Sequence, residues 1–241
     1  MVIRTKNLRK EYKDVVAVDN LNLDIREGEL FALLGVNGAG KTTTIKMLST
    51  LVSPTGGDAE ICGYSILKDA TAIKDIIDVS FQETAIARRL TVEENVDLYA
   101  NVSGYDKNKI AKVKEYIFDT FGLEQVRNKQ SSKLSGGWQR KLSIALSLIS
   151  EPKILFLDEP TLGLDVIARR ELWKTIADLK GKMTIILTTH YMEEAEALAD
   201  RIGIMKDGKL IFVGTKEELY QLTGKESVEN AFIELVTGGA Q

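Results

Sequence analysis

The stretch Gly35-Val36-Asn37-Gly38-Ala39-Gly40-Lys41-Thr42 decides the fold of this chain. An apolar run over residues 30–34 leads into it, and a helix-compatible stretch over residues 42–51 leads out. Glycine lacks a Cβ, so the backbone N–H groups of such a turn can close around phosphates. A glycine-rich turn can also be only a tight connection, but here every fixed position of G-x-x-x-x-G-K-[ST] is filled. The order of elements predicts a P-loop, in which Lys41 reaches the terminal phosphates and Thr42 binds Mg²⁺.

Bulk composition limits the classes of protein to consider. The chain has 241 residues, 44% of them hydrophobic and 28% charged, which is typical of a soluble globular protein with a sizeable core. A net charge of −3 argues against bulk electrostatic binding of nucleic acid. The single cysteine, Cys62, excludes an intramolecular disulfide, fits a reducing compartment and is expected to be a small buried residue.

The apolar runs bear on where the protein acts. No run approaches the ~20 residues that a membrane-spanning helix needs, and the N-terminus has no signal-peptide core. We therefore expect a cytosolic protein, and any role at a membrane must come through partner proteins.

Hydrophobic patterns predict an α/β domain. Residues 1–34 are expected to form antiparallel strands, because Leu21, Leu23 and Ile25 alternate with polar residues. Further strands and helices follow from the same patterns. The predicted strands are 59–64 (or a hairpin), 76–81, 154–157, 184–188, and a hairpin of 201–205 with 209–213; the predicted helices are 166–180, 192–199 and one beginning at the capping box 215–218.

The character of the chain changes after Gln82. A capping box at Thr91 opens a predicted helix to about residue 102, and two more helices are predicted over 107–121 and 138–149. We expect one domain, 1–241, divided into an α/β core with a β subdomain (1–83 and 151–225), a helical subdomain (84–150) and a C-terminal tail (226–241). Residues 226–236 of the tail are compatible with an amphipathic helix.

Charged and polar residues follow two of the predicted strands. Asp158 and Glu159 end the apolar run 154–157, where carboxylates are costly unless they serve a cation or a proton. Asp158 is a candidate for holding Mg²⁺ and Glu159 for polarising an attacking water. The only histidine, His190, follows the strand 184–188, at the sheet edge where ligands gather in α/β folds. Gln82 offers an amide oxygen to Mg²⁺ if its strand lies beside the P-loop.

A second anion site is predicted at Ser135-Gly136-Gly137, where an N-cap residue and two glycines precede a helix. With the stretch Leu134-Ser135-Gly136-Gly137, the sequence resembles the ATP-binding cassette (ABC) family, whose signature is LSGGQ. The resemblance covers nearly the whole chain. The motifs that match in order are Tyr12, residues 35–42 (Walker A), Gln82 (Q-loop), residues 134–138 (signature), residues 154–159 (Walker B and catalytic base), residues 162–165 (D-loop) and His190 (switch histidine).

The resemblance implies a P-loop NTPase core, with a RecA-like sheet and flanking helices, beside an antiparallel β subdomain and a helical subdomain. It implies ATP and Mg²⁺ as ligands, bound between the P-loop of one chain and the signature of a partner chain. It also implies roles for individual residues. These are catalysis by Glu159, His190, Lys41 and Gln82; nucleotide binding by Tyr12, Gly35, Asn37, Gly38, Ala39, Gly40, Lys41, Thr42, Thr43, Ser135, Gly136, Gly137 and Asp165; and metal binding by Thr42, Gln82 and Asp158.

Taken alone, the local sequence around Tyr12 favours a packing residue, whereas the resemblance implies an aromatic that stacks on adenine. Two positions depart from the family pattern. Trp138 replaces the last residue of LSGGQ, and Leu162 replaces the serine that usually precedes Gly163-Leu164-Asp165.

Stretches at 159–165, 189–196 and 227–235 resemble the exporter branch that handles drugs, lipids and polysaccharides. The resemblance implies an ATPase that forms a dimer, with a second copy as the first expectation, and acts with membrane-spanning permease subunits at the cytoplasmic face of the membrane. These subunits would dock on the helical region and the loop around Gln82. Two alternatives are a non-transport cassette, acting in assembly for example, and a purely regulatory nucleotide-binding module. The transported substrate does not follow from this sequence.

Overall fold

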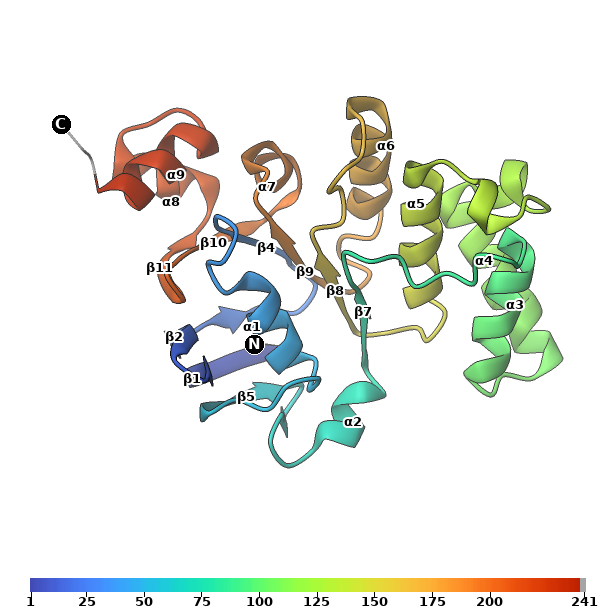
Figure 1. The fold of residues 1–241 in the computed structure, drawn as a ribbon, viewed down its shortest axis with the longest axis horizontal. Coiled ribbons are helices and arrows are strands. Elements are labelled where there is room, and N and C mark those ends of the chain that lie inside the picture. The colour runs from blue at the N-terminus through green and yellow to red at the C-terminus, as the bar shows by residue number, and fades with distance from the viewer. Residues whose placement is uncertain (239–241) are drawn as a thin grey trace.

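Two β-sheets with helices packed on them make up the computed structural model, which describes residues 1–238 (Figure 1). The strands of the larger sheet are β4 (Leu30–Leu34), β7 (Ile77–Ser80), β8 (Ile154–Asp158), β9 (Thr184–Thr189), β10 (Arg201–Lys206) and β11 (Lys209–Gly214). Their order is β11-β10-β4-β9-β8-β7, and every neighbouring pair is parallel except the β10–β11 hairpin. The predicted α/β class is confirmed.

The smaller sheet is antiparallel and is built mainly from the N-terminal part of the chain. Its strands are β1 (Ile3–Tyr12), β2 (Val15–Leu21), β3 (Asp24–Ile25), β5 (Gly56–Ile61) and β6 (Tyr64–Ser65). The prediction for residues 1–34 was right for β1, β2 and β3 but wrong for β4, which pairs in parallel with β9 and β10. All five residues of β4 are buried, as expected for a central strand covered on both faces.

The parallel strands separate two hydrophobic cores. In β8, Ile154 and Phe156 pack into the core shared with the smaller sheet and α1 (Lys41–Leu48), while Leu155 and Leu157 pack into the core on the opposite face. Successive side chains of a strand point to opposite faces, so a strand buried on both sides needs an unbroken apolar run. The run 154–157 has this pattern for that reason.

Of the other helices, α3, α4 and α5 form a group at one end of the molecule, and the rest lie beside the sheets (Figure 1). These other helices are α2 (Ala70–Lys74), α3 (Val92–Val102), α4 (Lys107–Phe121), α5 (Gly136–Ser147), α6 (Val166–Ala177), α7 (Met192–Leu198), α8 (Lys216–Thr223) and α9 (Val228–Thr237). Two short 3₁₀ turns, η1 (Leu123–Val126) and η2 (Ser131–Lys133), lie between α4 and α5. Helix α2 was not predicted, because its five residues are too few to establish a helical period.

The group of α3, α4 and α5 follows the predicted boundaries closely. Thr91 caps α3 in a capping box with Glu94, and Gly122 ends α4 in the left-handed conformation with φ of +60°. Asn95, fully buried in α3, connects α3 to η2, because its amide nitrogen donates to the Ser131 hydroxyl over 2.9 Å. Between β7 and β8 the structure has no strand in the described chain, as predicted.

Three further expectations meet mixed outcomes. Cys62 is only partly buried, because it occupies the turn between β5 and β6, where it has φ of +50°. The predicted tail helix is present as α9, and residues 239–241 of the tail lie outside the described residues. Within residues 1–238, no helix is both long and apolar enough to cross a membrane.

The capping box of α3 supplies a test of the fold. We expect Thr91→Ala to lower the free energy of unfolding by about 1 kcal/mol, because it removes the acceptor for the Glu94 backbone N–H at 3.2 Å. Urea unfolding followed by circular dichroism measures the change. Thr71→Ala, at an exposed position in the first turn of α2, is the control, and an equal loss in both variants would contradict the capping role.

Candidate functional site

The glycine-rich loop connects β4 to α1, and its conformation requires glycine at two positions. Gly38 has φ of +84° and Gly40 has φ of +104°, in a region that L side chains rarely adopt. A Cβ at Gly40 would also lie 2.4 Å from the Ala17 carbonyl oxygen. No side chain caps α1, so the backbone N–H groups of its first turn are available to an anion.

Lys41 places its ammonium group inside this loop. Its Nζ donates to the Gly35 carbonyl over 2.7 Å and to the Val36 carbonyl over 3.3 Å, and it lies 3.2 Å from Glu159 Oε1. The Lys41 side chain is only 6% exposed. A buried cation and a buried carboxylate in contact form a charged centre at the carboxyl end of the sheet.

Asp158 ends β8 and Glu159 follows it, and Thr188 forms a hydrogen bond with each of them. The Thr42 hydroxyl donates to Asp158 Oδ1 over 3.0 Å, and the Thr188 hydroxyl donates to the same oxygen over 2.6 Å. The Glu159 backbone N–H donates to the Thr188 hydroxyl over 3.1 Å. Glu159 itself has φ of +49°, a strained conformation for a residue that is not glycine.

Thr188 contacts Asp158 but was not among the predicted site residues. It lies opposite Asp158 in the parallel pairing of β8 with β9. A hydroxyl residue at the end of the strand that flanks the Asp158 strand is the signal that would have found it.

His190 completes the cluster. Its Nδ1 lies 2.7 Å from Glu159 Oε2, so Glu159 contacts Lys41 through one carboxylate oxygen and His190 through the other. A basic ring nitrogen and a carboxylate at hydrogen-bond distance can hold and transfer a proton.

Most of the predicted nucleotide-binding and catalytic residues line one cavity of about 500 Å³. They are Tyr12, Asn37, Gly38, Ala39, Gly40, Lys41, Thr42, Thr43, Gln82, Glu159 and His190, joined by Ala17 and Leu162. Tyr12 is 43% exposed, so it does not serve as a buried packing residue. A volume of several hundred Å³ is in the range of small-molecule binding sites.

Oxygen atoms suited to Mg²⁺ gather beside this cavity. Thr42, Gln82 and Asp158 line an adjoining cavity of about 570 Å³, and Thr42 and Asp158 are already in hydrogen-bond contact. In residues 1–238 no group of three or more acidic, cysteine or histidine side chains forms a metal site. The hydroxyl, amide and carboxylate set fits Mg²⁺, which binds through one or two carboxylates together with phosphate oxygens.

The signature residues lie apart from this cavity. Ser135 and Gly137 line a separate cavity of about 50 Å³, and Gly136 is exposed. A Cβ on Gly137 would lie 2.9 Å from the Ala168 Cβ, so glycine here also allows α5 to approach α6. Asp165 caps α6 by accepting from the N–H groups of residues 167 and 168. Within one chain the structure does not bring these residues to the P-loop.

A further buried acid, Glu194, lies within range of the charge of Glu159 and was not among the predicted site residues. It has no exposed surface, and its Oε1 accepts from the Thr161 hydroxyl and from Trp173 Nε1, each over 2.9 Å. Its Oε2 has no partner within the described chain. Burial raises the pKa of Glu194 above its ordinary value, and the charge of Glu159 acts in the same direction.

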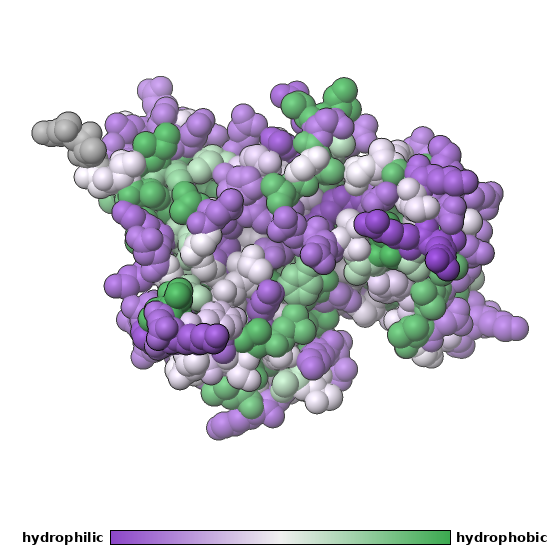
Figure 2. All heavy atoms as spheres, in the orientation of Figure 1, coloured by the Kyte–Doolittle hydropathy of each residue, from purple (hydrophilic) through white to green (hydrophobic). Residues whose placement is uncertain are grey.

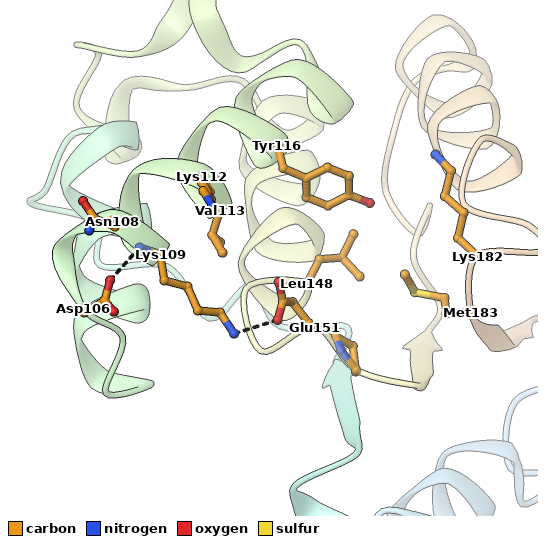
Figure 3. Close-up of a pocket in the computed structure, with 11 residues that line it drawn as sticks. Asp106, Asn108, Lys109, Lys112, Val113, Tyr116, Leu148, Glu151, Lys182 and Met183 are labelled. Atoms are coloured by element: carbon orange, nitrogen blue, oxygen red, sulfur yellow. Dashed lines mark hydrogen bonds and ion pairs between the residues drawn. The ribbon is translucent and has the colours of Figure 1, made fainter.

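A larger cavity, of about 720 Å³, lies elsewhere, between α4 and the loops that precede β8 and β9. Figure 3 shows Lys109 reaching from α4 toward Glu151, which it contacts over 2.8 Å. None of the predicted site residues lines this cavity. This cavity is therefore separate from the candidate nucleotide site, although it is larger.

Comparisons with known proteins show to which family the chain is similar. Residues 18–162 match the model of a family described as "ABC transporter". Among curated proteins, the phospholipid-transporting ATPase ABCA3 of Homo sapiens is 43% identical over 226 residues, which are 92% of this chain and 13% of that protein. The probable multidrug ABC transporter ATP-binding protein YbhF of Escherichia coli (strain K12) is 38% identical over 245 residues, which are 98% of this chain and 42% of that protein.

A solved structure is similar as well. It is a dimeric post-hydrolysis state of an ATP-binding cassette bound to ADP and Pi, with a TM-score of 0.78 and 28% identity. The match covers 88% of this chain and 98% of that chain. The fold is therefore that of a P-loop NTPase. The chain spans less than half the length of both curated relatives.

The raised pKa of Glu194 predicts a pH dependence of stability. The folded protein binds this proton more tightly than the unfolded chain, so the stabilisation is full below the unfolded pKa of about 4.3 and is lost as pH rises through the folded pKa. We expect Glu194→Gln, which cannot ionise, to gain stability relative to wild type as pH rises. The gain should be about 1.4 kcal/mol for each unit by which the pKa is raised.

Urea unfolding at several pH values above 4.3 tests this expectation. Glu193→Gln, at the exposed neighbouring position, is the control and should show no such trend. A constant difference between Glu194→Gln and wild type at all these pH values would contradict the raised pKa.

Proposed function

Because the chain belongs to the ABC transporter family, we propose that it is an ATPase subunit that converts ATP and water to ADP and phosphate and couples this reaction to export through membrane-spanning subunits. The observation that carries the proposal is the contact of Glu159 with both Lys41 and His190 beside the P-loop. A site for phosphates and a base for water thus occupy one cavity.

In this proposal each residue of the cluster has a distinct task. Glu159 accepts a proton from the water that attacks the γ-phosphate in line, and His190 orients Glu159 and contacts that phosphate. Lys41 offsets the charge that develops on the phosphate oxygens. The remaining loop residues, Gly35, Asn37, Gly38, Ala39, Gly40 and Thr43, bind the phosphate chain. Tyr12, exposed at the same cavity, stacks on the adenine ring.

Mg²⁺ is proposed as the metal that accompanies ATP. Thr42, Gln82 and Asp158 would hold it, and their hydroxyl, amide and carboxylate oxygens suit that ion. Bound there, the ion supplies positive charge to the phosphates. Asp158 is 3% exposed, and the Thr188 hydroxyl holds its carboxylate beside Thr42.

We also propose that two copies of the chain pair head to tail, with ATP between the P-loop of one and Ser135, Gly136 and Gly137 of the other. Two observations support pairing. Ser135 and Gly136 are exposed although they head a helix with an anion-binding terminus. Val166 and Ile167, next to Asp165, are 63% and 73% exposed, and Figure 2 shows apolar atoms exposed over α6. Exposed apolar patches mark interaction surfaces.

The membrane-spanning partners are proposed from the family and from the relatives. The relatives named as phospholipid and multidrug transporters support export, and the described chain has no helix of its own that could span a membrane. The chain would then work at the cytoplasmic face of the membrane. The helical segment 84–150 and the cavity beside Gln82, lined also by Phe81 and Glu83, are the surfaces we propose for docking.

The role of Glu159 is tested by Glu159→Gln. We expect hydrolysis to fall roughly 10²- to 10⁴-fold while ATP still binds, because the amide keeps the size of the side chain and loses its basicity. Light scattering should show the mass of this variant doubling when ATP is added. Glu115→Gln, at an exposed position on α4, is the control. Retained turnover would remove Glu159 as the base, and a monomer with ATP bound would contradict pairing of this chain with itself.

The role of Ser135 in the partner's site is tested by Ser135→Arg. We expect hydrolysis to fall by ~10²-fold, since the bulky side chain blocks the anion site at residues 135–137, while the monomer binds ATP as tightly as wild type. Isothermal titration and phosphate release measure the two properties. Ser132→Arg is the matched control, because Ser132 is exposed in η2 and lies outside residues 135–137. Loss of ATP binding by the monomer would argue against a role in the partner's site.

A further inference from the structure

Arg140, in the second turn of α5, is a buried cation held almost entirely by backbone carbonyl groups. It is 4% exposed, and in residues 1–238 it forms no ion pair with a carboxylate. Its Nε donates to the Pro160 carbonyl over 2.7 Å and one Nη to the Asp158 carbonyl over 3.1 Å. The other Nη donates to the Phe81 carbonyl and, over 3.4 Å, to the Gln82 carbonyl.

The guanidinium group keeps its charge in this environment. Burial lowers the pKa of Arg140 to about 10, and the charges of Asp158 and Glu194 oppose that shift. A pKa near 10 leaves the group protonated at neutral pH. A buried charge is tolerated only where hydrogen bonds satisfy it, and here four carbonyl oxygens do so.

The four carbonyls are not a random set of neighbours. Asp158 and Pro160 are the residues immediately before and after Glu159, so the guanidinium holds the backbone on both sides of Glu159. Glu159 has φ of +49°, and such a strained conformation persists only where the surrounding structure holds it. The other two carbonyls belong to Phe81, the first residue after β7, and to Gln82, which lines the P-loop cavity.

Arg140 also connects two parts of the fold through hydrogen bonds. The helical segment 84–150 is continuous with the sheet at only two places, after β7 and before β8. In Figure 1, α5 stands between the sheet and the pair α3 and α4. Arg140 lies on the same helix as Ser135, five residues further along, so a single rigid element carries both the signature turn and this contact.

We propose that Arg140 is a positioning residue for hydrolysis. It holds the backbone around Glu159 and Gln82 in place and connects it to α5, the helix that Ser135 caps. This inference rests on the proposed ATPase function. Arg140 lines neither the P-loop cavity nor the cavity of the signature residues. It therefore acts through Glu159 and Gln82 and does not touch the nucleotide.

The test compares Arg140→Met, Arg140→Lys and Leu142→Ala. Leu142 is fully buried in the same helix and belongs to the hydrophobic core, so it controls for a loss of stability in α5. Met has a similar length and no charge, while Lys keeps the charge but cannot span four carbonyls with a planar fork. We expect Arg140→Met to lower kcat at least tenfold, with nucleotide Kd within twofold of wild type, and Arg140→Lys to recover part of that loss.

Leu142→Ala should lower Tm while kcat per ATP-binding site stays within twofold of wild type. In a Glu159→Gln background, Arg140→Met should cause a smaller fold-loss of turnover than in wild type, because part of its effect passes through Glu159 and the rest through Gln82. Wild-type kcat in both Arg140 variants would overturn the proposal. So would the same fold-loss in the Glu159→Gln background as in wild type, or an equal loss of kcat in Leu142→Ala.

Hydrogen exchange separates this inference from the ATPase proposal, since it needs no turnover. We expect the amides of residues 81–84 and 158–161 to exchange at least tenfold faster in Arg140→Lys than in wild type, and to be unchanged in Leu142→Ala. The lysine variant keeps the buried charge and serves if the methionine variant fails to fold. An inactive wild type that shows this local effect would count against the function but not the contact, whereas unchanged exchange would overturn the contact.

Discussion

The parallel pairing of β4, β9 and β8 is the constraint on which the rest of the structure depends. It brings the carboxyl ends of these strands to one edge of the sheet, with Leu34 opposite Thr189 and Thr188 opposite Asp158. The P-loop, the two acids and His190 each follow one of these strand ends. Residues more than a hundred positions apart in the chain therefore meet in one cavity without any long-range loop to carry them.

The sequence predicted the parts of the fold that have strong local signals. Capping residues predicted the starts of α3 and α8, the glycine-rich loop predicted the turn between β4 and α1, and apolar runs predicted β8 and β9. The family resemblance then suggested the roles that we propose and that no local pattern carries, such as that of Tyr12. The parallel pairing of β4 was missed because its neighbours lie more than 150 residues away in the sequence.

Two of the residues that sequence reasoning did not find, Arg140 and Glu194, have no local signal. Arg140 looks like any basic residue on an amphipathic helix, and its proposed role arises from carbonyls at and just beyond the ends of two strands distant in the sequence. Glu194 lies in a run of acids that reads as a solvated surface, yet it is fully buried against Thr161 and Trp173. Tertiary packing decides these two cases, and a single sequence does not show it. Thr188 is different, because a hydroxyl residue at the end of the strand that flanks the Asp158 strand can be recognised in the sequence.

The two cores that flank β8 limit how this strand can vary over evolution. Exchange of one aliphatic side chain for another of similar volume changes only local packing, so Leu155 and Phe156 are free to drift among apolar residues. Insertion or deletion of a single residue is different, because it exchanges the side chains that face each core. It would also move Asp158 out of line with Thr188. The strand is therefore tolerant in composition and intolerant in length.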